Sequence, residues 1–354
     1  MKILQVNSAK NWGGGEAYTI NLCWNLISEG QDVRLACRPN SAISQIAREK
    51  KIPVIEYPLS GAIDFLSAFR LAQYCKKNGI QIVHAHLGRD YWITRYLKSF
   101  FPSVCLVFTR HVLKRIKSPA FYKWLLKKTD KVIAVSTAVK KNLLDQIQLP
   151  SEQVVTILNG IDINRFVMAC SGSLRKELGF DNKIKLVGMV GQVSSHKGSD
   201  LFIKSASLVS KKYSDVRFVI VGDDFQNGKY IGELKALSKD LSIENEVLFL
   251  GSRQDIPEIM KDLNVLVSAS KEESFGLVIV EAMAASTSVV ATNTKGAMEI
   301  VVNNKTGLLV DINQPAHLAD AIVSLLKDER LTENLGKAGQ ERAFKEFDSE
   351  RMIK

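Results

Sequence analysis

Two glutamates, Glu273 and Glu281, have the spacing most suggestive of chemistry, in Glu-Ser-Phe-Gly-Leu-Val-Ile-Val-Glu. One carboxylate precedes an expected helix and the other lies two turns into it, on roughly the same side. Gly276 would let a ligand approach the helix N-terminus, where backbone N–H groups can bind a phosphate. Glu281 stands among apolar residues, where a carboxylate is costly without a partner. The simpler alternative, a capping glutamate and an incidental surface glutamate, is less favoured.

A second candidate is the loop Gly-Gln-Val-Ser-Ser-His-Lys-Gly at residues 191–198, which directly follows an expected strand. Lys197 stands near the start of the next helix. A cation beside free N–H groups would hold a phosphate there. The alternative is a solvated lysine on a loop.

A third candidate is Trp-Gly-Gly-Gly-Glu at residues 12–16, between the first expected strand and the first expected helix. Its glycines would let the backbone approach an anion closely. It is not a dinucleotide fingerprint, because the second strand ends in Cys37-Arg38 rather than in an acidic residue. A plain glycine-rich turn is the alternative.

Three of the five histidines stand at the ends of expected strands: His84 and His86 on one, and His111 on the next. A ligand crevice is expected at such strand ends. A metal site at His84 and His86 lacks a carboxylate partner at suitable spacing, so no metal is expected. We interpret one of this pair as a core or hydrogen-bonded histidine. Asn-Gly-Ile-Asp at 159–162 favours a structural turn at a domain hinge.

These residues must be positioned by alternating apolar strands and amphipathic helices, the pattern of parallel sheets covered on both faces. The expected strands are 3–6, 32–37, 54–57, 80–84, 104–109, 131–135, 154–158, 185–190, 217–221, 247–250, 265–267, 289–291 and 307–310. The expected helices are 16–28, 62–77, 137–147, 198–212, 230–241, 256–263, 276–285 and 315–326. Segments 58–62 and 89–96 show no interpretable pattern and are expected to be loops.

The length of 354 residues and the restart of the pattern predict two doubly wound α/β domains, 1–165 and 166–354, with a linker at 168–173. The net charge of +11 is confined to the first domain. Residues 1–165 carry 24 basic and 11 acidic side chains, and residues 166–354 carry 24 and 26. An anionic partner should therefore meet the first half.

Composition also bears on compartment. No apolar run approaches the ~20 residues of a spanning helix, and the N-terminal apolar run is too short for a signal peptide. The five cysteines are widely spaced without a Cys-x-x-Cys pair, which argues against a disulfide framework and a zinc site. We expect a cytoplasmic protein with reduced thiols.

In this order, the motifs resemble those of the retaining glycosyltransferases of family 4, which have the GT-B fold. The similarity runs from residue 1 to about residue 345. Each motif is weak alone, but the ordered set is specific. The matching motifs are Gly-Gly-Gly-Glu at 13–16, Thr-x-His at 109–111, Asn-Gly-Ile-Asp at 159–162, Lys-Gly at 197–198, Val-Gly-Asp at 221–223, Phe-Leu-Gly at 249–251 and the two glutamates, 273 and 281.

The resemblance implies two Rossmann-like domains facing across a cleft. It also implies sugar transfer from a nucleotide-diphosphate sugar with retention, without an obligatory metal or other cofactor. Lys197 would bind the donor diphosphate, Glu281 the ribose hydroxyls, and Glu273 would lie near the donor sugar. The N–H groups of Phe275, Gly276 and Leu277 would contact donor phosphate or sugar. Gly14 and Gly15 would line the diphosphate, and His111 would lie beside the reacting centre. Lys197, Glu273 and His111 are thus the expected catalytic residues.

The sequence departs from the family pattern in places. Gln192, a donor-binding position, stands where the family usually has Arg, and His196 and Arg110 are candidate substitutes. Lys-Gly-Ala-Met-Glu at 295–299 replaces the usual Gly-Gly-x-Pro-Glu, and Ala285-Ser286 replaces a common Cys-Gly. The sequence stops at Lys354, where members of the family usually continue into a helix that crosses back to the first domain.

Residues 112–131 contain seven cations, one acidic residue and interleaved aromatic residues, a pattern typical of an interfacial helix on anionic lipid. The alternative is a solvated basic face whose aromatic side chains pack inward. No recognised nucleic-acid-binding module is present. We expect a glycosyltransferase that uses a nucleotide sugar, most favourably a UDP-sugar, and a glycan or lipid-linked acceptor in cell-surface polysaccharide or lipopolysaccharide biosynthesis. The alternatives are a nucleotide-sugar epimerase or hydrolase on the same fold, or a catalytically weak partner subunit.

Overall fold

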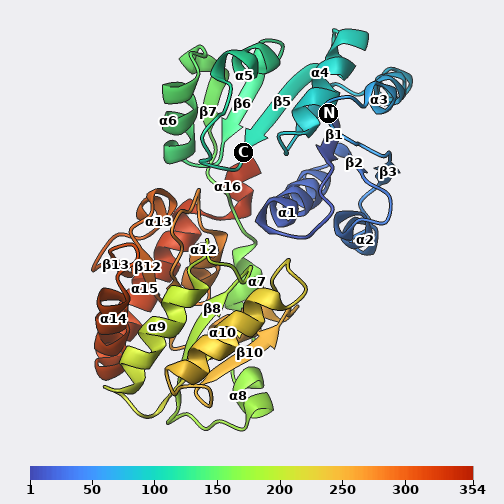
Figure 1. Ribbon diagram of the computed structural model, residues 1–354. Helices are drawn as coiled ribbons and strands as arrows, with labels where there is room; N and C mark the ends of the chain where they lie inside the picture. Colours follow the sequence, from blue (N-terminus) through green and yellow to red (C-terminus); the bar gives the residue numbers. More distant parts are fainter. Residues whose placement is uncertain (354) are drawn as a thin grey trace. The chain divides into compact units, whose positions relative to one another are not determined.

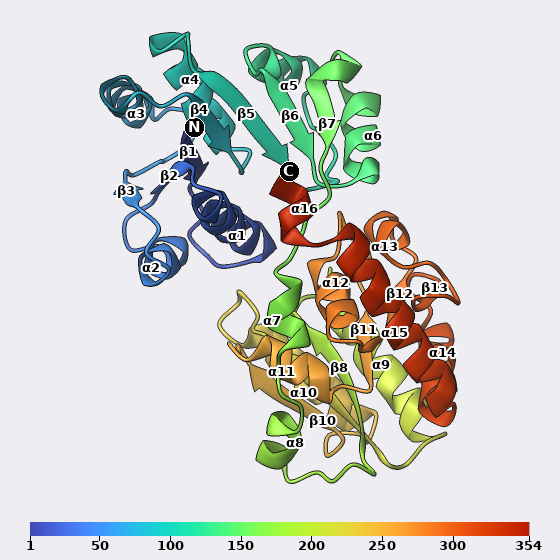
Figure 2. The same cartoon turned by 180° about the vertical axis from the view of Figure 1, so that it is seen from behind.

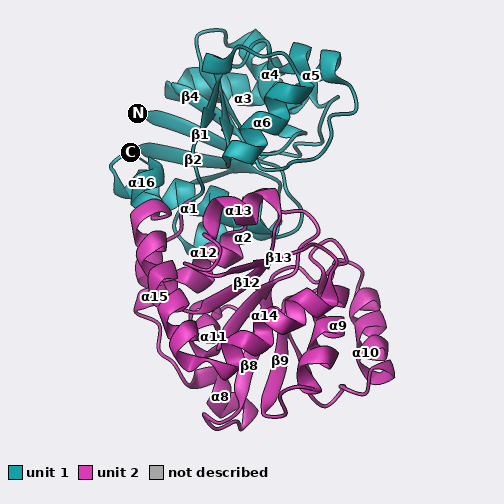
Figure 3. Ribbon diagram, turned by 90° about the vertical axis from the view of Figure 1, so that its left-hand side faces the viewer, with its two compact units in different colours: residues 1–159, 349–354 teal, residues 160–348 magenta. Residues whose placement is uncertain are grey.

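The structure is a computed structural model that describes residues 1–353. It divides into two compact units, coloured separately in Figure 3. Unit 1 comprises Met1–Asn159 and the C-terminal residues from Ser349, and unit 2 comprises Gly160–Asp348. The division falls inside the Asn-Gly dipeptide, a few residues before the boundary at 165 that the sequence suggested.

Unit 1 is built on a seven-stranded parallel sheet with the order β3-β2-β1-β4-β5-β6-β7 (Figure 1). Its strands are β1 (Lys2–Asn7), β2 (Asp32–Cys37), β3 (Val54–Glu56), β4 (Ile82–Ala85), β5 (Cys105–Arg110), β6 (Lys131–Ala134) and β7 (Val154–Thr156). The central strand β1 is buried along nearly its whole length, as expected for a parallel sheet covered on both faces.

The helices of unit 1 include three that the sequence did not predict, α2, α4 and α16, whereas α5 lies within the segment 112–131 that was expected to be an interfacial helix. The unit 1 helices are α1 (Gly14–Ser28), α2 (Ala42–Glu49), α3 (Phe65–Asn78), α4 (Asp90–Phe100), α5 (Pro119–Leu126), α6 (Thr137–Gln146), a 3₁₀ turn η1 (Ser151–Gln153) and α16 (Ser349–Ile353). The expectation of a loop at 89–96 is wrong. The aromatic and β-branched residues of α4 have low helix propensity, and burial of Tyr91, Ile93 and Leu97 stabilises this helix instead.

Unit 2 is built on a six-stranded parallel sheet with the order β10-β9-β8-β11-β12-β13. Its strands are β8 (Lys185–Val190), β9 (Val216–Val221), β10 (Val247–Gly251), β11 (Val265–Ser268), β12 (Ser288–Thr292) and β13 (Leu308–Val310). Its helices are α7 (Ile163–Val167), α8 (Ser173–Leu178), α9 (Ser199–Ser210), α10 (Lys229–Asp240), α11 (Ile256–Asp262), α12 (Leu277–Ala284), α13 (Lys295–Ile300), α14 (Pro315–Lys327) and α15 (Glu329–Glu346). Helices α14 and α15 pack beside β12, as Figure 2 shows.

The stretch expected to be a linker, residues 168–173, is held within unit 2. The buried carboxylate of Asp262 at the end of α11 accepts hydrogen bonds from the backbone N–H groups of Gly172 and Leu174. Small residues with weak patterning therefore mark a packed connection between α7 and α8, not a tether between domains.

The C-terminal end of the described chain returns to unit 1. After α15, the short helix α16 packs against α1 (Figure 3). A helix that crosses back is thus already formed before Lys354, where we had expected the sequence to stop short of it.

Each sheet contains one point at which the strand order reverses: between β1 and β4 in unit 1, and between β8 and β11 in unit 2. Doubly wound sheets bind ligands outside the carboxyl ends of the strands at such points. The glycine loop and His86 follow β1 and β4, and Lys197 and Glu273 follow β8 and β11. The topology therefore brings the sequence candidates to two ligand-binding edges, one on each unit.

Candidate active site

In unit 2, the loops that follow β8 and β11 are hydrogen-bonded to each other. The backbone N–H of Lys271 donates to the carbonyl oxygen of His196 at 2.9 Å. The Lys271 ammonium donates to the hydroxyl oxygen of Ser195 at 2.8 Å. The two loops that the sequence identified separately therefore form one wall.

Lys197 and Glu273 meet on this wall. The Lys197 Nζ donates to Oε2 of Glu273 at 2.6 Å, and the Ser270 hydroxyl donates to the same oxygen at 3.3 Å. Their side chains are 33% and 13% exposed, so the ammonium is the more accessible partner. An ammonium has three donors, so Lys197 can keep this ion pair and still bind a phosphate oxygen.

Gly198 fixes how closely α9 approaches this edge. It precedes α9 with a positive φ of 76°, and a Cβ at this position would lie 1.9 Å from the carbonyl oxygen of Ala269. Any other residue would force the backbone after β8 away from the backbone after β11. Packing therefore requires glycine at position 198, directly after Lys197.

The start of α12 is fixed in a similar way. Gly276 is its N-terminal cap, and the buried Phe275 ring packs edge-on against Phe347. The N–H of Gly296 donates to the Glu273 carbonyl oxygen at 3.0 Å. A Cβ on Gly296 would lie 2.6 Å from the backbone nitrogen of Phe275. The segment that departs from the family pattern thus keeps the glycine that this packing needs. Leu277 is the first residue of α12, whose first-turn N–H groups have no partner within a helix.

Glu281 lies on α12 and is partly exposed. Burial raises the pKa of its carboxyl to about 7, and the charge of Arg165 acts in the opposite direction. Arg165 lies on α7, where its guanidinium also donates to the Gln254 carbonyl oxygen at 3.2 Å. Sequence reasoning missed Arg165. The sequence feature that could have indicated it is the position of Arg165, three residues after Asp162. Asp162 ends the Asn-Gly-Ile-Asp motif, which we interpreted only as a turn.

Gln192 is exposed in the loop after β8, and so is His196. The other candidate substitute for a missing cation, Arg110, is a buried residue of unit 1. Its guanidinium donates to the Tyr122 hydroxyl at 3.1 Å and to the Lys114 carbonyl oxygen at 2.8 Å. These hydrogen bonds hold the segment after β5 in place. They do not favour Arg110 as the substitute for the cation that is missing at Gln192.

In unit 1, helix α1 begins at Gly14, so Gly14 and Gly15 are its first two residues and not a loop before it. The capping residue is Gly13, and no side chain caps this end. Glu16 in the first turn is buried, and burial raises the pKa of its carboxyl. Hydrogen bonds from the Asn7 side chain and the Gly13 backbone act in the opposite direction.

The start of the connection from β1 to α1 is held by Asp90, a second residue that sequence reasoning missed. Its carboxylate is fully buried and accepts hydrogen bonds from the backbone N–H groups of Ser8 at 3.3 Å and Leu87 at 3.1 Å, and from the Ser8 hydroxyl. Burial raises the pKa of Asp90 to about 7. Its segment was expected to be a loop, so no pattern marked it as the start of a helix.

The three histidines at the unit 1 edge form one cluster with Tyr18. The rings of His84 and His86 lie 4.3 Å apart, and the His111 ring lies 5.8 Å from His86 and 4.9 Å from Tyr18. The Nε2 atoms of His84 and His86 are hydrogen-bonded to the side chains of Thr109 and Gln5, at 2.6 and 2.7 Å. His111 Nε2 is buried without a hydrogen-bond partner.

Burial keeps this cluster uncharged at neutral pH. It lowers the pKa of His84 to about 3 and that of His111 to about 4, and it lowers the pKa of His86 well below its usual value. A neutral imidazole both donates and accepts a hydrogen bond. Within residues 1–353, no group of three or more His, Cys, Asp or Glu side chains has an arrangement that could hold a metal ion.

Two family models match this chain. Glycosyltransferase Family 4 matches residues 12–165, and Glycosyl transferases group 1 matches residues 172–342. Together they span nearly all of both units. The chain belongs to the group 1 / family 4 glycosyltransferases. The members of this family are enzymes that transfer sugars.

Curated relatives are identical to this glycosyltransferase at about a quarter of the aligned positions. N-acetyl-alpha-D-glucosaminyl L-malate synthase of Bacillus anthracis is 27% identical over 309 residues, which cover 85% of this chain and 78% of the relative. UDP-Gal:alpha-D-GlcNAc-diphosphoundecaprenol alpha-1,3-galactosyltransferase of Escherichia coli is 27% identical over 324 residues, which cover 86% and 83%.

Solved structures show the same fold. A glycosyltransferase from Rickettsia africae superposes with a TM-score of 0.90 at 25% identity, covering 99% of this chain and 95% of that one. Anabaena Alr3699/HepE in complex with UDP-glucose superposes with a TM-score of 0.86 at 25% identity, covering 100% and 97%. The fold of this glycosyltransferase is therefore GT-B, with two Rossmann-like α/β domains, as the sequence predicted.

Proposed function

We propose that this glycosyltransferase transfers a sugar from a UDP-sugar, with retention of anomeric configuration, to a glycan or lipid-linked acceptor in cell-surface polysaccharide or lipopolysaccharide biosynthesis. The observation that carries the proposal is the Lys197–Glu273 pair, which lies beside the start of α12 at the switch point of unit 2. A solved relative binds UDP-glucose, and a curated relative uses a lipid-linked acceptor.

Departure of UDP leaves negative charge on the diphosphate. Lys197 stabilises that charge together with the N–H groups of Phe275, Gly276 and Leu277, so the reaction proceeds without an obligatory metal. Glu281 accepts hydrogen bonds from the ribose hydroxyls, and Glu273 contacts the donor sugar while it orients Lys197.

On unit 1, Gly14 and Gly15 present the N-terminus of α1 to the diphosphate. His111 lies beside the reacting centre and helps to position donor or acceptor. We assign no general base. Gln192 occupies a donor-binding position without supplying a charge.

The acceptor of such a pathway is membrane-associated, and residues 112–131 supply cations and aromatic side chains for an anionic surface. We therefore place the enzyme in the cytoplasm, peripherally on the inner face of the cytoplasmic membrane. Among the described helices, none has the length and apolar character needed to cross a bilayer.

A nucleotide-sugar screen tests the function. Thermal shifts are measured with UDP-, GDP- and ADP-sugars, followed by product assays with the parent, Lys197→Ala and Glu281→Ala. We expect a UDP-sugar to raise the Tm of the parent, and the variants to transfer poorly. Transfer at parental rates by either variant would contradict its assigned role.

The same screen separates the alternatives. Rapid donor turnover without acceptor would favour an epimerase or hydrolase. The other alternative, a catalytically weak partner subunit, is motivated by Gln192. It would be favoured if no nucleotide sugar raised the Tm.

A further inference from the structure

Three lysines line an open hollow of about 390 Å³ in unit 1: Lys98, Lys127 and Lys128. The remaining lining residues are Ser99, Pro102, Thr129 and Asp130. Lys98 lies near the end of α4, and the other two lysines stand between α5 and the start of β6. The hollow is therefore at the amino edge of the parallel sheet, opposite the edge that carries His111.

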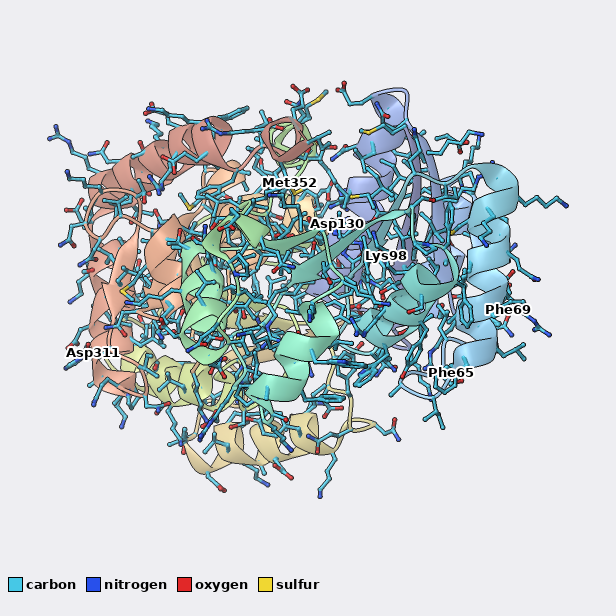
Figure 4. All side chains as sticks on the ribbon, turned by 90° about the horizontal axis from the view of Figure 1, so that it is seen from above. Phe65, Phe69, Lys98, Asp130, Asp311 and Met352 are labelled. Atoms are coloured by element: carbon cyan, nitrogen blue, oxygen red, sulfur yellow. The ribbon has the colours of Figure 1, made fainter. Side chains whose placement is uncertain are left out.

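The one acidic residue in the hollow is neutralised. The Asp130 carboxylate accepts hydrogen bonds from the Lys98 ammonium at 3.0 Å and from the backbone N–H of Leu106 at 2.7 Å (Figure 4). Lys128 donates to the Ser99 hydroxyl at 3.2 Å, and Lys127 is exposed. Two ammonium groups thus remain to attract an anion.

Aromatic side chains extend from α5 across α4 to α3, beside this hollow. Phe121 and Trp124 on α5 are 46% and 45% exposed, and the rings of both approach Trp92 on α4. The alternative in which the aromatic residues of 112–131 pack inward is therefore wrong for these two. It holds for Tyr122, which is only partly exposed and whose hydroxyl accepts a hydrogen bond from the Arg110 guanidinium at 3.1 Å.

The aromatic surface continues onto α3. The Phe65 ring lies tilted against that of Tyr96 with centroids 4.4 Å apart, and the Phe69 ring packs edge-on to that of Phe100 at 5.4 Å. Phe65, Phe69 and Phe100 are each more than 40% exposed. Figure 4 shows Phe65 and Phe69 along α3, with Lys98 and Asp130 on the neighbouring part of unit 1.

The accessible, unpaired charge around these rings is positive. Within α3, α4 and residues 118–131 there are nine Lys and Arg side chains and two acidic ones. The acidic residues are Asp90, which is buried, and Asp130, which is ion-paired. Separate aromatic side chains above a basic field favour the interface of an anionic bilayer, where rings enter the headgroup layer and lysines meet phosphates.

We propose that the hollow binds phosphate groups of anionic phospholipids, and that Phe65, Phe69, Phe121 and Trp124 anchor the surrounding surface in the headgroup layer. The proposal rests on the proposed membrane association and changes its location. The contact extends from the hollow at the amino edge over the outer faces of α5, α4 and α3. Residues 112–117, next to His111, are not part of it.

The first test is binding to phosphatidylcholine vesicles with and without phosphatidylglycerol, measured by co-sedimentation of the full chain. We expect Lys127→Glu/Lys128→Glu to weaken binding to the anionic vesicles by about 30-fold or more. The matched control is Lys114→Glu/Lys117→Glu, which makes the same change in net charge at the carboxyl edge and should bind close to the parent. Equal losses in the two variants, or no loss in the first, would overturn the proposal.

A second variant, Phe65→Ser/Phe69→Ser, changes no charge. We expect it to bind anionic vesicles several-fold more weakly than the parent; parental binding would remove α3 from the surface. A third measurement adds inorganic phosphate to the full chain and records the Tm. If phosphate raises the Tm through Lys127 and Lys128 while vesicles do not bind, the hollow takes a soluble phosphate and the lipid proposal fails.

These measurements need no sugar transfer, so they separate the two proposals. Loss of vesicle binding with an unchanged Tm shift by a UDP-sugar would affect the membrane surface alone. Vesicle binding by a protein that no nucleotide sugar stabilises would contradict the proposed function and leave the lipid site standing.

Discussion

The two ligand-binding edges of this glycosyltransferase have opposite electrostatic character. At the unit 2 edge, a partly exposed lysine and a carboxylate are paired at 2.6 Å, and Glu281 lies near Arg165. At the unit 1 edge, three histidines are packed against Tyr18 and held neutral by burial. Yet unit 1 carries the excess positive charge of the chain.

This difference suggests that the two edges have different tasks: the unit 2 edge is suited to binding a charged diphosphate, and the unit 1 edge to positioning a neutral sugar. In the proposed function, Lys197 neutralises the charge of the donor diphosphate locally, so unit 2 needs no net positive charge. The neutral histidine cluster can orient a sugar hydroxyl without attracting anions. The net charge of unit 1 is used elsewhere on its surface, and part of it lies at the amino edge of the sheet, around Lys98.

The largest effect should come from removing the charge at the unit 2 edge. Lys197→Ala is expected to lower kcat/KM for the donor about 100-fold to 1,000-fold, because it removes a cation that stabilises the leaving diphosphate. Steady-state kinetics with saturating acceptor measure it. Lys204→Ala, which removes an exposed lysine of α9, serves as the control and should match the parent.

The next effect concerns the backbone contact that builds this edge. Gly198→Ala is expected to destabilise unit 2 by about 3 kcal/mol, because its Cβ would meet the Ala269 carbonyl oxygen. Denaturant unfolding measures the change. Gly232→Ala within α10 has open space around its Cβ and should be neutral or slightly stabilising. Similar losses for the two variants would mean that the close approach at Gly198 is not the cause.

A smaller effect distinguishes the edges by pH. Because its pKa is about 7, Glu281 should gain its charge as pH rises through neutrality, and the donor KM should fall over that range. Glu281→Gln should abolish this inflection. His111→Asn should lower the rate without moving the inflection, because the pKa of His111 is about 4. An inflection that disappears with His111 would reverse the assignment.

The smallest expected effect is on stability. Since the folded-state pKa of Glu281 is raised, its carboxyl disfavours the fold increasingly as pH rises from about 4.5 through about 7. Glu281→Gln should therefore gain Tm relative to the parent at pH 8 and show no such gain at pH 4. A gain of the same size at pH 4 would point to packing in place of ionisation.

Most of the fold was predictable because its signals are local. Buried parallel strands such as 185–190 are short, continuous apolar runs, and the predicted bounds agree with β8. Helix α4 was missed because its aromatic and β-branched residues have low helix propensity, and tertiary packing stabilises it instead.

The candidate site was predictable where residue type and backbone requirement coincide. Lys197-Gly198 and Glu273 were found from motifs, and the structure brings them into contact. Arg165 and Asp90 were missed because their roles depend on residues distant in sequence: the charge of Arg165 acts on Glu281, and Asp90 accepts a hydrogen bond from Ser8. No local periodicity records such pairs.

The return of α16 to α1 makes unit 1 discontinuous, with unit 2 inserted between its two parts. During synthesis the last strand and helices of unit 2 leave the ribosome before α16 does. Unit 2 therefore has all its residues available for folding first, although it comes second in the sequence. A fragment ending at Asn159 would leave the α16-binding surface of α1 uncovered, whereas residues 160–348 form a continuous piece that can be expressed intact.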